Sequence, residues 1–198
     1  MAPPQPDRSS VPDAEIVRLV RDGETAAFAE LVRRTRRPAY RLARRITRNH
    51  EDADDVIQES YVKAYRALHR YDSSRAFGPW FLTIVARTAL SQLRRGALRA
   101  ATPLDEPMGE EGMTIGERLP DPAQGADARH RLIDVERAFA RLSDEHRAIL
   151  ALRVDGDLPY TEIAEALDIP AGTVMSRLAR ARDALLEEIR KRDGGGSR

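Results

Sequence analysis

The sequence predicts an all-α fold of two small helical domains joined by a flexible acidic linker. Apolar residues recur at three- and four-residue spacing through most of the chain, strand signals are nearly absent, and a stretch of prolines, glycines and acids interrupts the pattern. A chain of 198 residues can bury one medium core or two small ones. We therefore expect a disordered arm at 1–12, a first domain at 13–99, the linker at 100–128, a second domain at 129–192 and a disordered tail at 193–198.

Composition narrows the class of protein. With 33% charged and 41% apolar residues, the chain has a wide polar surface and enough apolar material to fold. No stretch approaches the roughly 18 apolar residues of a membrane span, and the N-terminal MAPPQPDRSSVPD does not resemble an export signal. We therefore expect no membrane insertion and a cytoplasmic location. Because the chain has no cysteine, it can form no disulfide, thiolate zinc site or thiol nucleophile.

Charge is distributed unevenly along the chain, although its net value is only +1. Residues 28–99 hold 16 Arg and Lys against 7 Asp and Glu, whereas residues 100–128 hold one Arg against seven acids. Residues 129–198 balance at 13 against 13. The chain is therefore divided into a basic block, an acidic tether and a neutral block, which are physically different segments.

The first domain is predicted to be helical almost throughout. Apolar spacing continues from Phe28, and the chain resumes as helix after Pro38. Residues 51–68 form the strongest predicted helix, with a buried face made by Ala53, Val56, Ile57, Ser60, Ala64 and Leu68. A loop at 70–80, with Ser-Ser and Gly-Pro breakers, separates it from a helix at 81–95.

The second domain is predicted to hold four helices. Residues 129–142 form the first, and Ser143 can cap the second. Thr161 can cap a short third helix, and the turn Asp168-Ile169-Pro170 separates it from a long helix at about 171–190. A short helix, a tight turn and a long helix are typical of a helix-turn-helix, whose second helix enters the major groove of DNA.

The long helix has one apolar and one polar face. The apolar face contains Val174, Leu178, Ala181 and Leu185, which step by four, three and four residues. The opposite face contains Thr173, Ser176, Arg177 and Arg180 and no acid. Arg can bond guanine or phosphate, and Ser and Thr can do either more weakly, so this face is suited to reading DNA. A basic face can also be only a solvated surface, but the helix-turn-helix context favours the DNA interpretation.

Two long segments resemble a known family. The stretch DADDVIQESYVKAYRALHRYDSSRAFGPWFLTIVARTALSQLRR is similar to region 2 of the extracytoplasmic-function (ECF) sigma factors of the sigma-70 family, and LSDEHRAILALRVDGDLPYTEIAEALDIPAGTVMSRLARARDAL is similar to their region 4. The resemblance covers most of residues 14–190. It implies a specificity subunit of RNA polymerase, without catalytic activity, metal or cofactor of its own. Region 2 would recognise and melt the minus-10 promoter element, and region 4 would read the minus-35 element.

The resemblance also implies three partners: core RNA polymerase through its beta and beta-prime subunits, promoter DNA, and an anti-sigma factor. It assigns the polymerase contact to a helix that carries Asp54, Asp55, Gln58 and Glu59. The last three stand at i, i+3 and i+4, which places them on one stripe beside the buried face. Alternatively, acids near the start of a helix can have no partner and only interact favourably with the helix dipole. A metal site is a weaker alternative, because neither a histidine nor a second acidic cluster accompanies them.

For the minus-10 element, the resemblance points to Arg75, Phe77, Trp80, Arg87, Arg94 and Arg95, with Arg99 just beyond. A cation and ring faces can stabilise an unstacked base, and the later arginines can add phosphate contacts. Phe77 and Trp80 can equally be core residues. Arg87 stands where the family often has asparagine and Ser91 where it often has aspartate, so the minus-10 preference can differ from the usual one. Asp168 fills a turn position where glycine is common.

Other functions stay open at this stage. The acidic linker can mimic a polyanion inside the polymerase or act only as a tether. A regulator that binds duplex DNA as a dimer, without opening it, would share the helix-turn-helix. An interaction-only adaptor would not need the arginine face. An enzyme finds little support, because the four histidines are scattered and neither a phosphate-loop nor a His-Glu-x-x-His motif occurs.

Overall fold

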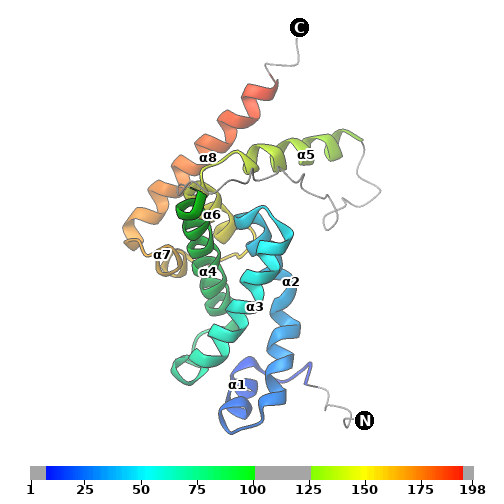
Figure 1. The fold of residues 1–198 in the computed structure, drawn as a ribbon, viewed down its shortest axis with the longest axis vertical. Coiled ribbons are helices and arrows are strands. Elements are labelled where there is room, and N and C mark those ends of the chain that lie inside the picture. The colour runs from blue at the N-terminus through cyan, green and yellow to red at the C-terminus, as the bar shows by residue number, and fades with distance from the viewer. Residues whose placement is uncertain (1–7, 101–125, 194–198) are drawn as a thin grey trace.

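The protein is described by a computed structural model over residues 8–100 and 126–193 (Figure 1). Its helices are α1 (Asp13–Arg21), α2 (Phe28–Thr47), α3 (His50–Ala67), α4 (Phe77–Ala100), α5 (Ala126–Ala140), α6 (Asp144–Val154), α7 (Tyr160–Leu167) and α8 (Ala171–Asp193). Single 3-10 turns occur at Thr25–Ala27 and Leu68–Arg70. The described residues contain no strand, so the all-α prediction is confirmed. Most of the predicted arm, linker and tail lies outside the described residues.

The first domain is built around α2, α3 and α4, with α1 packed at one end of α2 (Figure 1). Six side chains of this core are 0% exposed: Leu31, Leu42 and Ile46 from α2, Val56 from α3, and Phe81 and Val85 from α4. The side chain of Asn49 caps α3 by accepting a hydrogen bond from the backbone N–H of Glu51 at 2.8 Å. The predicted buried face of this helix is confirmed at all six positions, and its burial leaves the opposite side of α3 at the surface.

Two prolines of the first domain lie inside helices, where the sequence predicted breaks. Helix α2 runs through Pro38 without interruption, and its neighbours Thr35 and Ala39 are both buried against the core. A proline removes one intrahelical hydrogen bond, but burial on both sides of it holds this helix together. Helix α4 begins at Phe77, so the predicted loop at 70–80 ends too late. Pro79 is tolerated there because backbone N–H groups of a first turn have no helical partner.

The second domain packs α6, α7 and α8 around a small aliphatic core, with α5 beside α8. Val174, Leu178 and Ala181 of α8 are buried in it, as predicted, whereas Leu185, the fourth residue of the predicted face, is only half-buried against it. Ser143 caps α6 by accepting a hydrogen bond from the backbone N–H of His146 at 3.3 Å, which confirms that prediction too. The predicted Thr161 cap is wrong, because α7 begins at Tyr160 and Pro159, two residues before Thr161, occupies its N-cap position.

The helix-turn-helix turn depends on one residue in an unusual conformation. Asp168 ends α7 with φ 53° and ψ 51°, in the left-handed region that favours glycine. Its backbone N–H and that of Ile169 return to carbonyl oxygens of α7 at 3.3 and 3.0 Å. Pro170 then precedes α8. This compact reversal sets the angle between the two helices and exposes the beginning of α8.

The two domains contact each other over two areas. Helix α7 packs on α4, and α6 packs on the C-terminal half of α2 (Figure 1). Arg147 of α6 is only 1% exposed and donates to the carbonyl oxygen of Ile46 in α2 at 3.2 Å. None of the helices in the described ranges is long and apolar enough to cross a lipid bilayer.

Candidate nucleic-acid and polymerase interfaces

The start of α8 presents the four residues predicted to read the minus-35 element. Ser176 and Arg180 are exposed, whereas Thr173 and Arg177 are half-buried. Ser176 Oγ donates to the carbonyl oxygen of Thr173 at 2.9 Å, and Arg180 Nε lies 3.4 Å from the carbonyl oxygen of Ser176. Burial of the opposite face fixes the outward direction of these side chains. The structure therefore brings the four together on one surface, as the spacing predicted.

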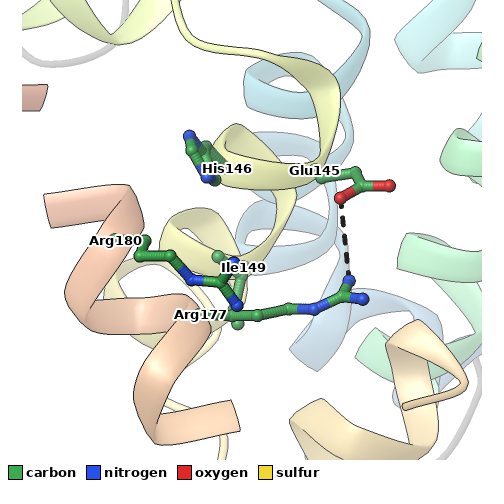
Figure 2. A pocket seen from close by; sticks show the side chains of 5 residues that line it. All are labelled: Glu145, His146, Ile149, Arg177 and Arg180. Atoms are coloured by element: carbon green, nitrogen blue, oxygen red, sulfur yellow. Dashed lines mark ion pairs between the residues drawn. The ribbon is translucent and has the colours of Figure 1, made fainter. Parts of the chain in front are cut away.

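The two arginines of this surface also face the preceding helix. Figure 2 shows Arg177 and Arg180 along a small hollow that they share with Glu145, His146 and Ile149 of α6. Arg177 forms a long ion pair with Glu145 at 3.7 Å. Sequence analysis did not connect Glu145 with α8, because an acid in the first turn of a helix is explained by the helix dipole alone. A long, partly exposed ion pair is weak, so Glu145 does not commit Arg177 to this contact.

The stripe predicted to bind polymerase lies on the outer side of α3. Asp54, Asp55 and Gln58 are exposed. Glu59 is engaged within the domain, because Lys63 binds it at 2.7 Å and Arg95 of α4 at 3.6 Å. The hydrogen bond from Lys63, supported by the charges of Lys63 and Arg95, lowers the pKa of Glu59. Three of the four residues thus face solvent, and the fourth joins α3 to α4.

The aromatic residues predicted to meet the minus-10 element form a layer at the start of α4. Phe77 is 0% exposed and stacks on Phe81 with ring centroids 6.0 Å apart. Trp80 is half-buried, with its ring 5.4 Å from Phe77 and 4.7 Å from Tyr71. Phe77 is therefore a core residue, and Trp80 lies at the edge of the same core, where part of its ring stays accessible.

Tyr71 is a member of this aromatic layer that sequence analysis missed. Burial, together with the nearby carboxylate of Asp13, raises the pKa of Tyr71 to about 12. Its hydroxyl therefore stays protonated at neutral pH and donates a hydrogen bond to the carbonyl oxygen of Arg75. This bond links the loop before α4 to the aromatic layer. In the sequence, the only indication that Tyr71 belongs to this layer is its position at the start of the predicted loop, close to Phe77 and Trp80.

The arginines predicted to contact minus-10 DNA have different surroundings. Arg75 binds Glu165 at 3.1 Å and Glu162 at 3.4 Å, both in α7. Arg87 donates from Nε to the backbone carbonyl oxygen of Glu165 at 3.2 Å. Arg94 and Arg95 are exposed on α4, and the side chain of Arg99 lies outside the described residues. The structure thus places Arg75 and Arg87 against α7, and Arg95 near Glu59 of α3.

No metal centre is indicated by the described part of the chain, where His, Asp and Glu do not gather in groups of three that could hold an ion. Asp52, the first acid of the stretch similar to region 2, instead accepts a hydrogen bond from Gln92 of α4 at 2.7 Å. Its contact is structural and joins α3 to α4.

These features define a DNA-binding protein whose first domain is basic, helical and carries an aromatic layer, and whose second domain holds a helix-turn-helix. Family models agree with both halves. Residues 31–99 match the model for Sigma-70 region 2, and residues 132–185 match the model for Sigma-70, region 4. The chain belongs to the sigma-70 family.

Curated relatives place the chain in the ECF group of this family, and a solved structure shares its fold. The chain is 35% identical over 174 residues to the ECF RNA polymerase sigma factor SigM of Mycobacterium tuberculosis, covering 87% of this chain and 82% of the relative. It is 29% identical over 181 residues to SigW of Bacillus subtilis, covering 88% and 95%. The fold is similar to that of RpoE from Bartonella quintana, solved with the anti-sigma factor NepR, at a TM-score of 0.62 and 22% identity over 82% of this chain and 96% of that one.

Proposed function

We propose that this chain is a promoter-specificity subunit that binds core RNA polymerase and directs transcription initiation at minus-10 and minus-35 elements. The observation that carries the proposal is the presence of both sigma regions in order, each with the surface its role requires. The first domain offers an acidic stripe and a row of arginines, and the second offers an arginine face on α8. Acting on core polymerase, it has no catalytic activity of its own and works in the cytoplasm.

The stripe on α3 is the proposed contact with core polymerase. Asp54, Asp55 and Gln58 are exposed and share one helical face, and Glu59 is oriented by Lys63 and Arg95. In this family the corresponding helix docks on a coiled coil of the beta-prime subunit. Asp55→Arg with Gln58→Ala removes a carboxylate and an amide and introduces a cation, and it leaves the buried face of α3 intact. We expect lost core binding with unchanged helicity.

A charge reversal elsewhere tests whether that loss is local. Glu15→Arg reverses an exposed acid of α1 whose ion-pair partner, Arg18, is three residues further along the same helix. It should bind core polymerase as the wild type does. If the double variant binds core polymerase as tightly as the wild type does, the stripe is not part of the interface.

The beginning of α4 is the proposed minus-10 contact. Trp80 offers a partly exposed ring at the edge of the core, suited to stacking on an unpaired base. Phe77 is fully buried. It packs against the Trp80 ring from the core side and holds it in place, and it is not proposed to contact DNA. Arg75, Arg87, Arg94, Arg95 and Arg99 would bind phosphates and hold the opened strand. The minus-35 contact is assigned to Thr173, Ser176, Arg177 and Arg180 of α8.

Regulation by an anti-sigma factor is part of the proposal. The structurally similar RpoE was solved with the anti-sigma factor NepR, and the similar CnrH with the cytosolic domain of CnrY. We infer that a protein of that kind restrains this chain by covering its polymerase- or DNA-binding surfaces. The acidic segment 100–128 is assigned a path through the polymerase, where its seven acids against one Arg would imitate nucleic acid.

One experiment tests the whole proposal. Purified protein is added to core polymerase, and transcripts are mapped on the DNA upstream of its own gene. Defined initiation that requires both protein and core polymerase is expected. A footprint by the protein alone, with no start sites in the presence of polymerase, would identify a dimeric helix-turn-helix regulator instead. Changing the linker acids to Ser or Gln and measuring abortive and full-length transcripts tests the linker separately, and unchanged yields would leave it only a tether.

A further inference from the structure

One apolar side chain is exposed beside the DNA-reading residues of α8. Met175 stands between the buried Val174 and the exposed Ser176, and it is 68% exposed. Of the described side chains of α8, the other large apolar one at the surface is Leu186, which lies towards the C-terminal end and is 48% exposed. Isolated apolar residues are common on protein surfaces, so it is the position of Met175 that gives it meaning.

Met175 lies on one edge of the DNA-reading face. By the helical repeat, Ser176 points directly away from the buried face of α8. To one side of it are Arg180 and Arg177, which line the hollow against α6 (Figure 2). To the other side is Met175, and Ala179, four residues further along the chain, continues that side. The face therefore has a cationic edge, made by Arg177 and Arg180, and an apolar edge, made by Met175 and Ala179.

The Met175 side chain does not fold back onto its own helix. A helical side chain leans towards the N-terminus, over the residues three and four positions earlier, which for Met175 are Gly172 and Ala171. Neither has a side chain long enough to hold it. A Cβ atom placed on Gly172 would meet no atom within 4 Å, that of Met175 included. Met175 therefore extends outward at the start of α8, which is the end of a recognition helix that meets base edges.

The major groove of DNA contains one apolar group at its base edges, the C5 methyl group of thymine. The other groups there are hydrogen-bond donors and acceptors, which a thioether satisfies poorly. Methionine is unbranched and polarizable, so it adapts to a small apolar partner. Contact between the Met175 side chain and a thymine methyl removes apolar surface of both from water, which is favourable. Among the base edges, thymine is therefore the partner that suits the apolar edge.

We propose that Met175 contacts the C5 methyl group of a thymine in the minus-35 element and adds a thymine preference to the polar contacts of Ser176 and Arg180. The proposal rests on the proposed function, which places α8 in the major groove of that element. The two edges of the face then select different base pairs, because arginine binds guanine and an apolar side chain binds thymine. Specificity at one position of the element is set by a side chain without charge or hydrogen-bond donor.

The test uses holoenzyme assembled from core polymerase and the full-length chain. Met175→Gln keeps the length of the side chain and replaces its thioether by an amide, whereas Met175→Leu keeps it apolar. Leu186→Gln makes the same kind of change at the other exposed apolar position of α8 and is the matched control. Circular dichroism verifies that every variant is folded. Affinity for promoter DNA is compared at one salt concentration, because phosphate contacts make it salt-dependent.

Changes to the DNA isolate the methyl group. Promoters varied at each minus-35 position first show where the wild-type holoenzyme prefers thymine on either strand. Each such thymine is then replaced by deoxyuridine, which lacks only the C5 methyl group and pairs in the same way. At one of these positions, we expect deoxyuridine to weaken binding about fourfold for the wild type and for Leu186→Gln. The same replacement should leave the affinity of Met175→Gln unchanged, because the two changes remove one shared contact. Met175→Leu should retain part of the response.

Two results would overturn the methyl contact. One is an equal loss on deoxyuridine replacement in the wild type and in Met175→Gln, and the other is a wild type that responds to deoxyuridine at no position. If selectivity at the minus-35 element depends on Arg180 and not on Met175, the inference fails and the proposed function stands. A wild-type holoenzyme that binds every minus-35 variant equally would refute the reading of that element by α8, and the inference with it.

Discussion

The two surfaces assigned to DNA differ in how they are made. On α8, four polar side chains lie within two turns of one helix and face outward because the opposite face is buried. In the first domain, the surface combines a loop, the start of α4 and a half-buried aromatic layer, and α7 covers part of it. The comparison teaches that a surface on a single helix follows from local spacing, whereas an assembled surface depends on contacts that only the tertiary structure provides.

The largest expected effect is a loss of stability, and it should differ between the two aromatic residues of the assembled surface, Phe77 and Trp80. Phe77→Ala removes a fully buried ring and should lower the free energy of unfolding by about 3–5 kcal/mol, measured by urea denaturation. Trp80→Ala should cost clearly less stability, since the ring is half-buried, and should weaken promoter opening in the holoenzyme. Equal destabilisation by both substitutions, with normal promoter opening by Trp80→Ala, would make Trp80 a core residue only.

Sequence reasoning succeeded where the evidence is local. The periodicity of α3 and α8 predicted which side chains are buried, and Ser143 was recognised as a cap from its place before an apolar pattern. Sequence reasoning failed where the effect of a residue depends on where its helix begins. Pro79 was interpreted as a helix breaker, although a first turn accepts proline.

Contacts between the domains could not be predicted at all. Glu165 is an ordinary solvated acid in the sequence, and only packing of α7 on α4 brings it to Arg75. Tyr71 likewise gains its partner, the carbonyl oxygen of Arg75, from the fold of the loop. The candidate residues on α8 and α3 were therefore placed correctly on their helices, whereas the state of Arg75 and Arg87 had to come from the structure.

On the single-helix surface, a smaller effect is expected from each arginine. Arg177→Ala or Arg180→Ala should weaken minus-35 recognition by about 1–3 kcal/mol if the side chain contacts a base. The measurement is holoenzyme binding to promoters that vary at each minus-35 position. Arg190→Ala, exposed further along α8, is the matched control and should change salt dependence at most. Wild-type selectivity at every position in both variants would contradict the assignment.

The turn before α8 should give a still smaller effect. Asp168 is in the left-handed conformation, which costs a residue with a Cβ atom about 1–2 kcal/mol, and less for Asp. Asp168→Gly should therefore raise the free energy of unfolding of the second domain by less than about 1 kcal/mol, because glycine loses more backbone entropy on folding. Asp168→Val, a β-branched substitution, should lower it. A destabilising glycine variant would indicate that the Asp168 side chain stabilises the turn.

The smallest effect concerns how the basic first domain balances its charge. Glu30 lies between two arginines, with Arg33 at 2.6 Å and Arg34 at 2.7 Å. Their hydrogen bonds, Arg33 first and then Arg34, lower the pKa of Glu30 from 4.5 to about 2. Since the pKa is lower in the folded state, the ionised group stabilises the fold above pH 4.5, and this contribution is lost as the pH falls through about 2.

Glu30→Gln removes that contribution and should flatten the acid limb of the stability profile between pH 4.5 and about 2. Urea denaturation at several pH values measures it. In the balanced second domain, Glu188→Gln is the comparison, because the hydrogen bond from Lys191 also lowers the pKa of Glu188. The basic domain should depend more on its acid, since Glu30 binds two cations, one of which also binds Asp13 of α1. An equal change of slope in both variants would mean that the second cation at Glu30 adds nothing to the acid sensitivity of the fold.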